Sequence, residues 1–240
     1  MYSYLPRIDA PLSDKKAKEI KKLIKKNKLS FLTHFTHIDN LRSIIQFGIL
    51  PPAILKTNRN FSSVRYNSIS LPPGWERFVS LNLSFPDNKL LMQLQNHQPS
   101  EWIILLIDIR VIYEFPCYFF PERANDCICR SPLPGQFLDQ YADPKDLAAL
   151  FEDQGEVKRK ALEIPPYYPT NPGTEILSSF PISPAYISQI HFYSDYKFNQ
   201  WVLSNTEFAL SQDKNRWACG LQYYSPRSDY MYWKTVRPSS

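Results

Sequence analysis

Hydrophobic positions recur at helical spacing near the start of the chain and at strand spacing further along. Between residues 13 and 29 the apolar side chains fall three or four residues apart, and the Ser-Asp pair at the start is placed to cap the first turn. This pattern predicts an amphipathic helix with a lysine face. The following residues predict a strand over 31–35 and a helix over 38–47 that ends at Gly48.

Strand and helix patterns then alternate. Residues 78–85 place polar and apolar side chains on opposite faces, as in a strand, and 102–109 form a continuous apolar run typical of a buried strand. Residues 53–75 are polar and rich in turn residues, and we expect a long, functional loop there. The other predicted elements are helices over 87–97, 144–151 and 195–210, a strand beginning near residue 175 and a strand over 187–192.

These elements predict a single α+β domain with a mixed or antiparallel sheet. The chain has no internal repeat and no linker long enough to divide it. We therefore expect a basic helical extension over residues 1–30 and one globular unit over residues 31–240.

Composition supports a packed protein and excludes several classes. Hydrophobic residues make up 43% of the 240 residues and charged residues 21%, which is ordinary globular usage. No apolar run approaches the roughly 18 residues of a membrane span, and the first residues lack the apolar core of a signal peptide. We expect a cytoplasmic protein without a membrane contact.

The candidate metal ligands are weak. Cys127 and Cys129 form a Cys-x-Cys pair with no matching second pair, so four reduced thiols are favoured over a zinc site. His34 and His37 lie three residues apart, and such a pair is more often packed than metal-binding. Walker, Gly-x-Gly-x-x-Gly, His-Glu-x-x-His and Gly-x-Ser-x-Gly motifs are all absent. We expect no metal.

Positive charge is concentrated at one end of the chain. The net charge is +5, and residues 1–30 hold nine basic residues against three acidic ones. A lysine face of this kind attracts a phosphate backbone, which makes Lys21, Lys22 and Lys25 candidate nucleic-acid contacts. The alternative is an ordinary solvated helix face.

Four short motifs follow one another between residues 30 and 192. The first is a His-apolar-Thr strand followed by His-Ile-Asp-Asn-Leu at the start of a helix that ends at a glycine. The second is an arginine before a Pro-Pro-Gly turn and a strand, the third an apolar strand with a later Phe, Asn and short helix, and the fourth Pro-Thr-Asn-Pro-Gly-Thr-Glu-Ile-Leu. The first motif spans 34–41 and Gly48, and the second comprises Arg65, 71–74 and 78–85. The third comprises 102–108, Phe120, Asn125 and 147–153, and the fourth lies within 168–177. Together they resemble the DarT-type ADP-ribosyltransferase toxins, which modify bases in single-stranded DNA.

The resemblance implies an ADP-ribosyltransferase fold, in which a split β-sheet core holds NAD in the cleft between its halves. It implies Glu175 and Arg65 as catalytic residues and NAD as the consumed substrate. The implied NAD-binding residues are His34, Phe35, Thr36, Asn40, Leu41 and Arg65. It further implies the toxin of a toxin–antitoxin or phage-defence system, with a macrodomain antitoxin that removes the modification.

The chemistry fits these residue types. Breaking the nicotinamide–ribose bond creates an oxocarbenium-like sugar, which a carboxylate such as Glu175 stabilises, as carboxylates do in glycoside hydrolysis. An arginine stays protonated, so we expect Arg65 to position the pyrophosphate or the target nucleotide. Trp75 and Arg77 are candidate nucleic-acid contacts, and Tyr66, Trp75 and Phe78 are candidates for stacking on a base. Because 15% of the residues are aromatic, core packing is the alternative for each aromatic side chain.

One position departs from the family pattern. Two residues before the glutamate the family commonly has Gln, whereas this chain has Gly173. That position faces the acceptor in ADP-ribosyltransferases, so the choice of target is open. We therefore keep two alternatives to a DNA-modifying enzyme: the same chemistry on RNA, and a non-catalytic nucleic-acid-binding module.

Overall fold

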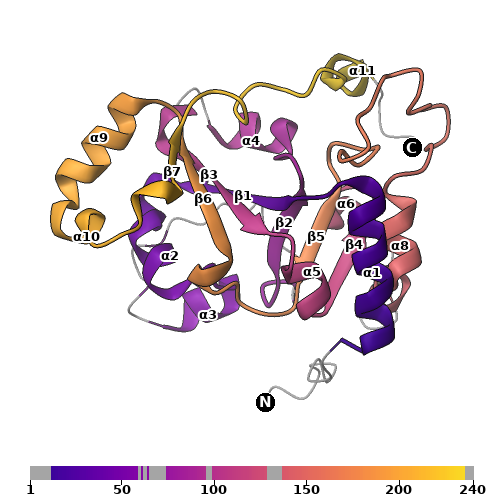
Figure 1. The fold of residues 1–240 in the computed structure, drawn as a ribbon, viewed down its shortest axis with the longest axis horizontal. Helices are drawn as coiled ribbons and strands as arrows, with labels where there is room; N and C mark the ends of the chain where they lie inside the picture. The colour runs from indigo at the N-terminus through magenta and orange to yellow at the C-terminus, as the bar shows by residue number, and fades with distance from the viewer. Residues whose placement is uncertain are drawn as a thin grey trace.

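The computed structural model describes residues 12–58, 61, 64, 74–95, 99–128 and 137–235. Its centre is a seven-stranded sheet in the order β4-β5-β2-β1-β3-β6-β7 (Figure 1). Every neighbouring pair is antiparallel except β6 and β7, which are parallel. The strands are β1 (Phe31–His37), β2 (Val79–Leu83), β3 (Trp102–Asp108), β4 (Cys117–Phe120), β5 (Glu175–Ser178), β6 (Ile187–Phe192) and β7 (Trp217–Cys219). The prediction of an α+β fold with a mixed sheet is confirmed.

Helices cover both faces of this sheet and both of its edges. In Figure 1, α9 and α10 flank the β7 edge, and α1 and α8 lie toward the β4 edge. The helices are α1 (Asp14–Asn27), α2 (Leu41–Phe47), α3 (Pro52–Thr57), α4 (Asn88–Gln95), α5 (Val111–Glu114), α6 (Ala124–Ile128), α8 (Pro144–Ala149), α9 (Asp195–Ser204), α10 (Thr206–Leu210) and α11 (Tyr230–Thr235). None of the helices in the described ranges is long and apolar enough to cross a membrane.

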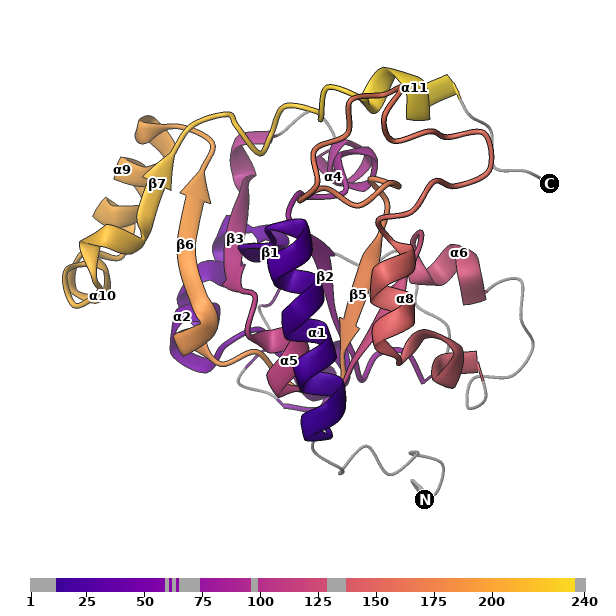
Figure 2. The same ribbon diagram turned by 45° about the vertical axis from the view of Figure 1, so that its right-hand side comes forward.

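The lysine-rich helix α1 packs against the domain. Ser13 caps its first turn, and Lys28 ends it in the left-handed conformation. The helix lies against α5 and α8, and its Ile20 is buried in the main core. Figure 2 shows α1 lying across one face of the sheet. The residues expected to form a basic extension therefore supply part of the core.

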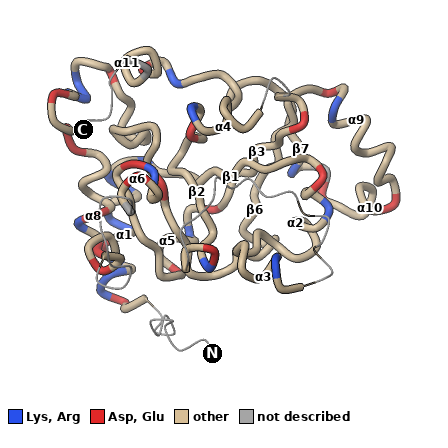
Figure 3. The backbone as a smooth tube through the Cα atoms, turned by 180° about the vertical axis from the view of Figure 1, so that it is seen from behind, with Lys and Arg blue, Asp and Glu red and all other residues tan. Residues whose placement is uncertain are grey.

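The two faces of the sheet carry different cores. The larger cluster is mainly aliphatic and joins the sheet to α1, α2, α5, α8 and α9. On the opposite face, Phe35, Trp102 and Ile104 pack with Leu91 of α4, and a second aromatic cluster gathers around Trp75 and α6. The strands carry almost no charge, and the basic and acidic positions lie in helices and loops (Figure 3).

Several elements differ from the prediction in detail. Helix α3 lies within the segment predicted as loop, and much of the remainder of that segment lies outside the described residues. The helix predicted over 195–210 is two helices, because Asn205 leaves the helical conformation. Strand β2 stops at Leu83, since Ser84 has a φ of 61° and turns the chain. The short elements α5 and β4 were not predicted, because four residues are too few for a periodic pattern.

Strand β1 pairs very unequally with its two neighbours. Its ladder with β3 runs over seven residue pairs, from Phe31–Asp108 to His37–Trp102. Its ladder with β2 has only the pairs Leu32–Leu83 and Thr33–Asn82. The two central strands therefore separate beyond Thr33, and the sheet opens there.

Candidate active site

A cavity of about 420 Å³ lies where β1 and β2 separate. Ligand pockets commonly have volumes from about 300 to 1,000 Å³, so this one is large enough for a nucleotide-sized molecule. Its described lining includes polar side chains from three strands, from the residue before α2 and from the residues around α6: His34, Thr36, Asn40, Ser80, Asn82, Arg123, Asn125, Asp126 and Glu175. Apolar side chains from α2, α3, α4 and the Trp75 region complete the wall.

Glu175, the first residue of β5, presents its carboxylate to this cavity. Ser80 on the neighbouring strand donates a hydrogen bond to Oε1, and the backbone N–H of Ala124 donates to Oε2 over 2.7 Å. Burial raises the pKa of Glu175, and the two hydrogen bonds oppose that rise because they favour the charged form. The carboxylate is thus fixed in orientation at both oxygens.

Arg123 and Asp87 form an ion pair beside this carboxylate. Arg123 Nε donates to Asp87 Oδ2 over 2.6 Å, and Asp87 Oδ1 accepts the N–H of Leu90 at the start of α4 over 3.1 Å. Among the described lining residues, Arg123 is the only arginine or lysine. Neither residue was predicted from the sequence, because two residues separated by 36 positions come together only in the fold.

His34 bridges the opening in the sheet. Its Nδ1 lies 2.9 Å from the carbonyl oxygen of Ser80 on β2. A carbonyl only accepts, so Nδ1 carries the hydrogen and Nε2 is left as an acceptor in the neutral ring. Burial lowers the pKa of His34, which favours this neutral form.

The remaining motif residues of β1 and α2 divide into two groups. Phe35, Thr36 and Asn40 line the cavity, and the side-chain amide of Asn40 donates to Thr36 Oγ1 over 2.9 Å. Leu41 does not reach it. Its side chain is fully buried in the aliphatic core and packs there, and the NAD-binding role expected for Leu41 stays a prediction.

Gly48 closes one rim of the cavity at a point of close contact. Its φ is 86°, and a Cβ there would lie 2.2 Å from the carbonyl oxygen of Ile182. The N–H of Ile49 donates to that same oxygen over 2.9 Å. Only glycine permits this approach, which explains why the α2 motif ends with this residue.

The described residues expected to contact nucleic acid fall into two groups, one beside Phe78 and one on α1. Trp75 is 3% exposed and belongs to the aromatic cluster, although it also lines the cavity. The Arg77 guanidinium lies 4.8 Å from the Phe78 ring. Lys21, Lys22 and Lys25 are exposed on α1, and none of them is among the described residues that line the cavity. Arg65 and Tyr66 lie outside the described residues.

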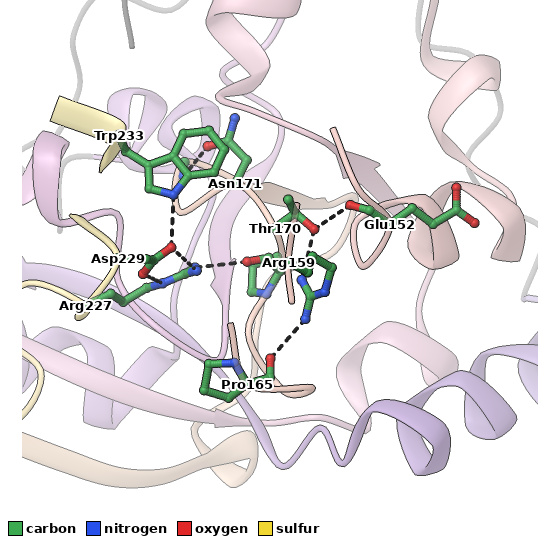
Figure 4. Close-up of polar contacts among 10 residues, drawn as sticks. Glu152, Arg159, Pro165, Thr170, Asn171, Arg227, Asp229 and Trp233 are labelled. Atoms are coloured by element: carbon green, nitrogen blue, oxygen red, sulfur yellow. Dashed lines mark hydrogen bonds and ion pairs between the residues drawn. The ribbon is translucent and has the colours of Figure 1, made fainter. Parts of the chain in front are cut away.

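A network of polar contacts holds the loop that leads to Glu175 (Figure 4). Arg159 donates to Thr170 Oγ1 and to the Pro165 carbonyl, and Thr170 in turn donates to the Glu152 carbonyl. From a distant segment, Arg227 donates to the Pro169 carbonyl over 3.1 Å and pairs with Asp229. Arg227 and Asp229 are both buried. The loop is therefore held by Arg159 from within the same segment and by Arg227 from a distant one.

Gly173 lies in this loop in close contact with Asn171. Its N–H donates to Asn171 Oδ1 over 2.8 Å, and a Cβ added at residue 173 would lie 3.3 Å from that same oxygen. A side chain at this position therefore requires Asn171 Oδ1 to move by a few tenths of an ångström.

Metal ligands do not gather at the cavity. Over the parts of the chain that the structure describes, no three His, Cys, Asp or Glu side chains form a group able to hold a metal ion. Cys117 and Cys219 are free thiols, the Cys127 thiol donates to Glu122 Oε1, and Cys129 lies outside the described residues.

Comparison with solved structures identifies the fold. No protein-family model matches the chain, and no curated protein matches it in sequence. The structure of Thermus sp. 2.9 DarT in complex with ADP-ribosylated ssDNA matches with a TM-score of 0.50 and 16% identity, over 82% of this chain and 97% of that one. The same DarT in complex with NAD+ matches with a TM-score of 0.48 and 18% identity, over 81% of this chain and 97% of that one.

A longer relative matches over part of its length. Thermosipho africanus DarTG in complex with ADP-ribose has a TM-score of 0.49 and 16% identity, and the match covers 81% of this chain but only 50% of that one. The chain thus spans about half of DarTG and nearly all of the Thermus DarT structure with ADP-ribosylated ssDNA. With the TM-score of 0.50 to that Thermus structure, this chain has the DarT-type ADP-ribosyltransferase fold.

Proposed function

We propose that this protein is an NAD-dependent mono-ADP-ribosyltransferase that modifies a base in single-stranded DNA and releases nicotinamide. The observation that carries the proposal is the Glu175 carboxylate, which two hydrogen bonds fix at the wall of a nucleotide-sized cavity. The fold adds support, because the Thermus DarT with the same fold was solved in complex with ADP-ribosylated ssDNA.

The cavity residues suit the reaction. In it the bond between nicotinamide and the ribose breaks, the electron pair leaves with nicotinamide, and the base forms the new bond to the ribose carbon while losing a proton. Glu175 stabilises the positive charge that develops on the ribose. His34 Nε2 is an acceptor for a hydroxyl or amide donor of NAD, and Arg123 is a cation for its pyrophosphate.

The acceptor side of the site differs from the family pattern. At Gly173 the chain offers only a backbone N–H, which Asn171 already accepts. The loop network of Arg159, Thr170 and Arg227 places this backbone beside Glu175. We propose that the target base is selected by neighbouring side chains of the cavity wall, such as Asn125 and Asp126.

The biological role that fits this chemistry is that of a toxin. We propose that ADP-ribose left on DNA bases slows growth, and that a macrodomain antitoxin is the partner that removes it. An arrest of growth on expression of this chain, relieved by a macrodomain hydrolase, is the expected phenotype.

Intact-mass spectrometry of DNA and RNA oligonucleotides of equal sequence tests the activity. After incubation with the protein and NAD, we expect the mass of one ADP-ribose to be added to DNA alone. Addition to RNA alone overturns the DNA assignment and selects the RNA alternative. If ADP-ribose is added to neither oligonucleotide while the protein is folded and NAD is intact, the proposed transferase activity on nucleic acid is overturned. The non-catalytic binding module then remains.

A further inference from the structure

A second cavity, of about 340 Å³, lies beyond the catalytic one. It is bounded by the end of α1, the start of β1, the residues after β2, the loop before β5 and a segment near residue 223. Its described lining is Lys28, Ser30, Phe31, Ser84, Phe85, Tyr167, Tyr168, Gln222 and Tyr223. Nothing in the proposed chemistry at Glu175 uses these residues.

Five aromatic side chains form most of this wall. Phe31 and Phe85 each lie 5.9 Å from Tyr223, and Phe85 lies 5.5 Å from Tyr168. Tyr167 lies 4.7 Å from Tyr168 at an interplanar angle of 74° and is 41% exposed. A cluster of ring edges and faces that remains open at one side is suited to a flat aromatic ligand.

The charge around this cavity is positive. Lys28 lines it, and Lys25 and Lys26 precede it in the last turn of α1. All three are exposed, no ion pair involves them among the described residues, and no described lining residue is acidic. Aromatic rings beside unpaired cations, here Lys25, Lys26 and Lys28, are the features that bind single-stranded nucleic acids.

One face of β1 contributes side chains to both cavities. Phe31 lines the second cavity and Phe35 the first, and residues four apart on a strand share a face. At about 3.3 Å per residue they are about 13 Å apart. That distance equals about four nucleotides at the 3.4 Å spacing of a B-DNA strand, and fewer in an extended strand.

We propose that this cavity, which we call the stacking pocket, binds a base of the same single-stranded DNA a few nucleotides from the modified base. The base stacks on Tyr167 and its neighbours, and the adjoining phosphates contact Lys28 and the last turn of α1. The lysine-rich helix α1, which does not line the cavity at Glu175, thereby contacts the phosphates of the bound strand. This inference rests on the proposed function for the identity of its ligand.

Fluorescence anisotropy with DNA of two lengths tests the stacking pocket. Tyr167→Ala is expected to bind a single-stranded 12-mer about tenfold more weakly than wild type, since one base–aromatic stack is lost. A dinucleotide is too short to span both cavities and is expected to compete equally with both proteins. Tyr167→Phe keeps the ring and should restore 12-mer binding.

The charge is tested separately. Lys28→Asn retains a residue that tolerates the left-handed cap and removes one cation. It is expected to reduce the dependence of log K on log salt by about 0.7 for a single strand. Lys18→Gln removes the same charge about 15 Å away along α1, and Tyr196→Ala removes an exposed tyrosine on α9. Both control variants should bind as wild type does.

The outcomes separate the two proposals. Unchanged 12-mer affinity in Tyr167→Ala, or an equal loss with the dinucleotide, overturns the stacking pocket even if the wild-type protein modifies DNA. A length-dependent loss in a protein that transfers no ADP-ribose supports the pocket and overturns the enzyme. Loss of binding to a 12-mer of RNA but not of DNA overturns the assignment to DNA.

Discussion

The two ladders of β1 show how one strand serves both stability and the site. Toward β3 every residue of β1 is paired, and the β3 side chains from Trp102 to Ile107 on that ladder are apolar and buried. Toward β2 the pairing stops after two residues, and His34 reaches the Ser80 carbonyl in place of a further ladder. The closed ladder holds the core together, and the open one supplies the walls and polar groups of the cavity.

This comparison predicts opposite responses to substitution, and the largest effect belongs to the open side. Glu175→Gln is expected to lower the rate of ADP-ribose transfer roughly a thousandfold, because the neutral amide does not stabilise the cationic ribose. Single-turnover transfer to an oligonucleotide measures it. A variant within tenfold of wild type would remove Glu175 from the chemistry.

The same variant should be more stable than wild type. The folded protein raises the pKa of Glu175 above its ordinary 4.5, so the folded state binds this proton more tightly than the unfolded state does. Stability from this group is therefore greatest at low pH and falls as the pH rises through the raised pKa. Thermal unfolding should show a higher Tm for Glu175→Gln at neutral pH, and no difference below the ordinary glutamate pKa.

On the closed side, Ile107→Ala should cost stability and spare the chemistry. Ile107 is fully buried and pairs with Leu32, and such truncations cost about 3 kcal/mol. Urea unfolding measures this loss. Under conditions where the variant is folded, its KM for NAD should equal that of wild type, and a raised KM would contradict the separation of the two ladders.

His34→Ala should weaken NAD binding and leave stability nearly unchanged. Loss of the ring removes the acceptor that we assign to NAD, so the KM for NAD should rise about tenfold, as for a hydrogen bond worth about 1.4 kcal/mol. The free energy of unfolding should change by about 1 kcal/mol or less, since the ring is only partly buried. Steady-state kinetics and urea unfolding on the same preparation separate the two quantities.

Ser80→Ala gives the smallest expected effect and tests the pKa directly. The Ser80 hydroxyl favours the charged form of Glu175, so its removal raises the pKa of Glu175 further. The acidic limb of the pH–rate profile should move to higher pH, with a severalfold loss of rate under acidic conditions and little loss under alkaline ones. A uniform loss across the profile would assign Ser80 a role other than tuning this carboxylate.

Much of the fold follows from periodicity in the sequence. Strands β1, β3 and β6 and helices α1 and α4 were predicted close to their observed bounds, because each presents a regular apolar pattern over six residues or more. Strand β4 was missed because it is short and lies between helices. The motif order pointed to Glu175 and His34, and the structure places both at one cavity.

The rest of the site depends on contacts between distant residues. Arg123 and Asp87 carry no local signal, and Ser80 looked like an ordinary polar position of an alternating strand. Leu41, in contrast, did have a local signal. Its place in a motif predicted a ligand contact, whereas its side chain is buried in the core. Motifs therefore indicated the neighbourhood, and tertiary packing decided which side chains reach the cavity.

The contact between Arg227 and the loop before Glu175 bears on how the protein is made. Synthesis runs from the N-terminus, and the strands that form the cavity are complete well before Arg227, Asp229 and Trp233 are added. Until those residues are added, the Pro169 carbonyl lacks the hydrogen-bond donor that holds it, and the loop that leads to Glu175 is held only by its contacts with earlier residues. We therefore expect the loop before Glu175 to reach its final order only after residues 227–233 have been synthesised.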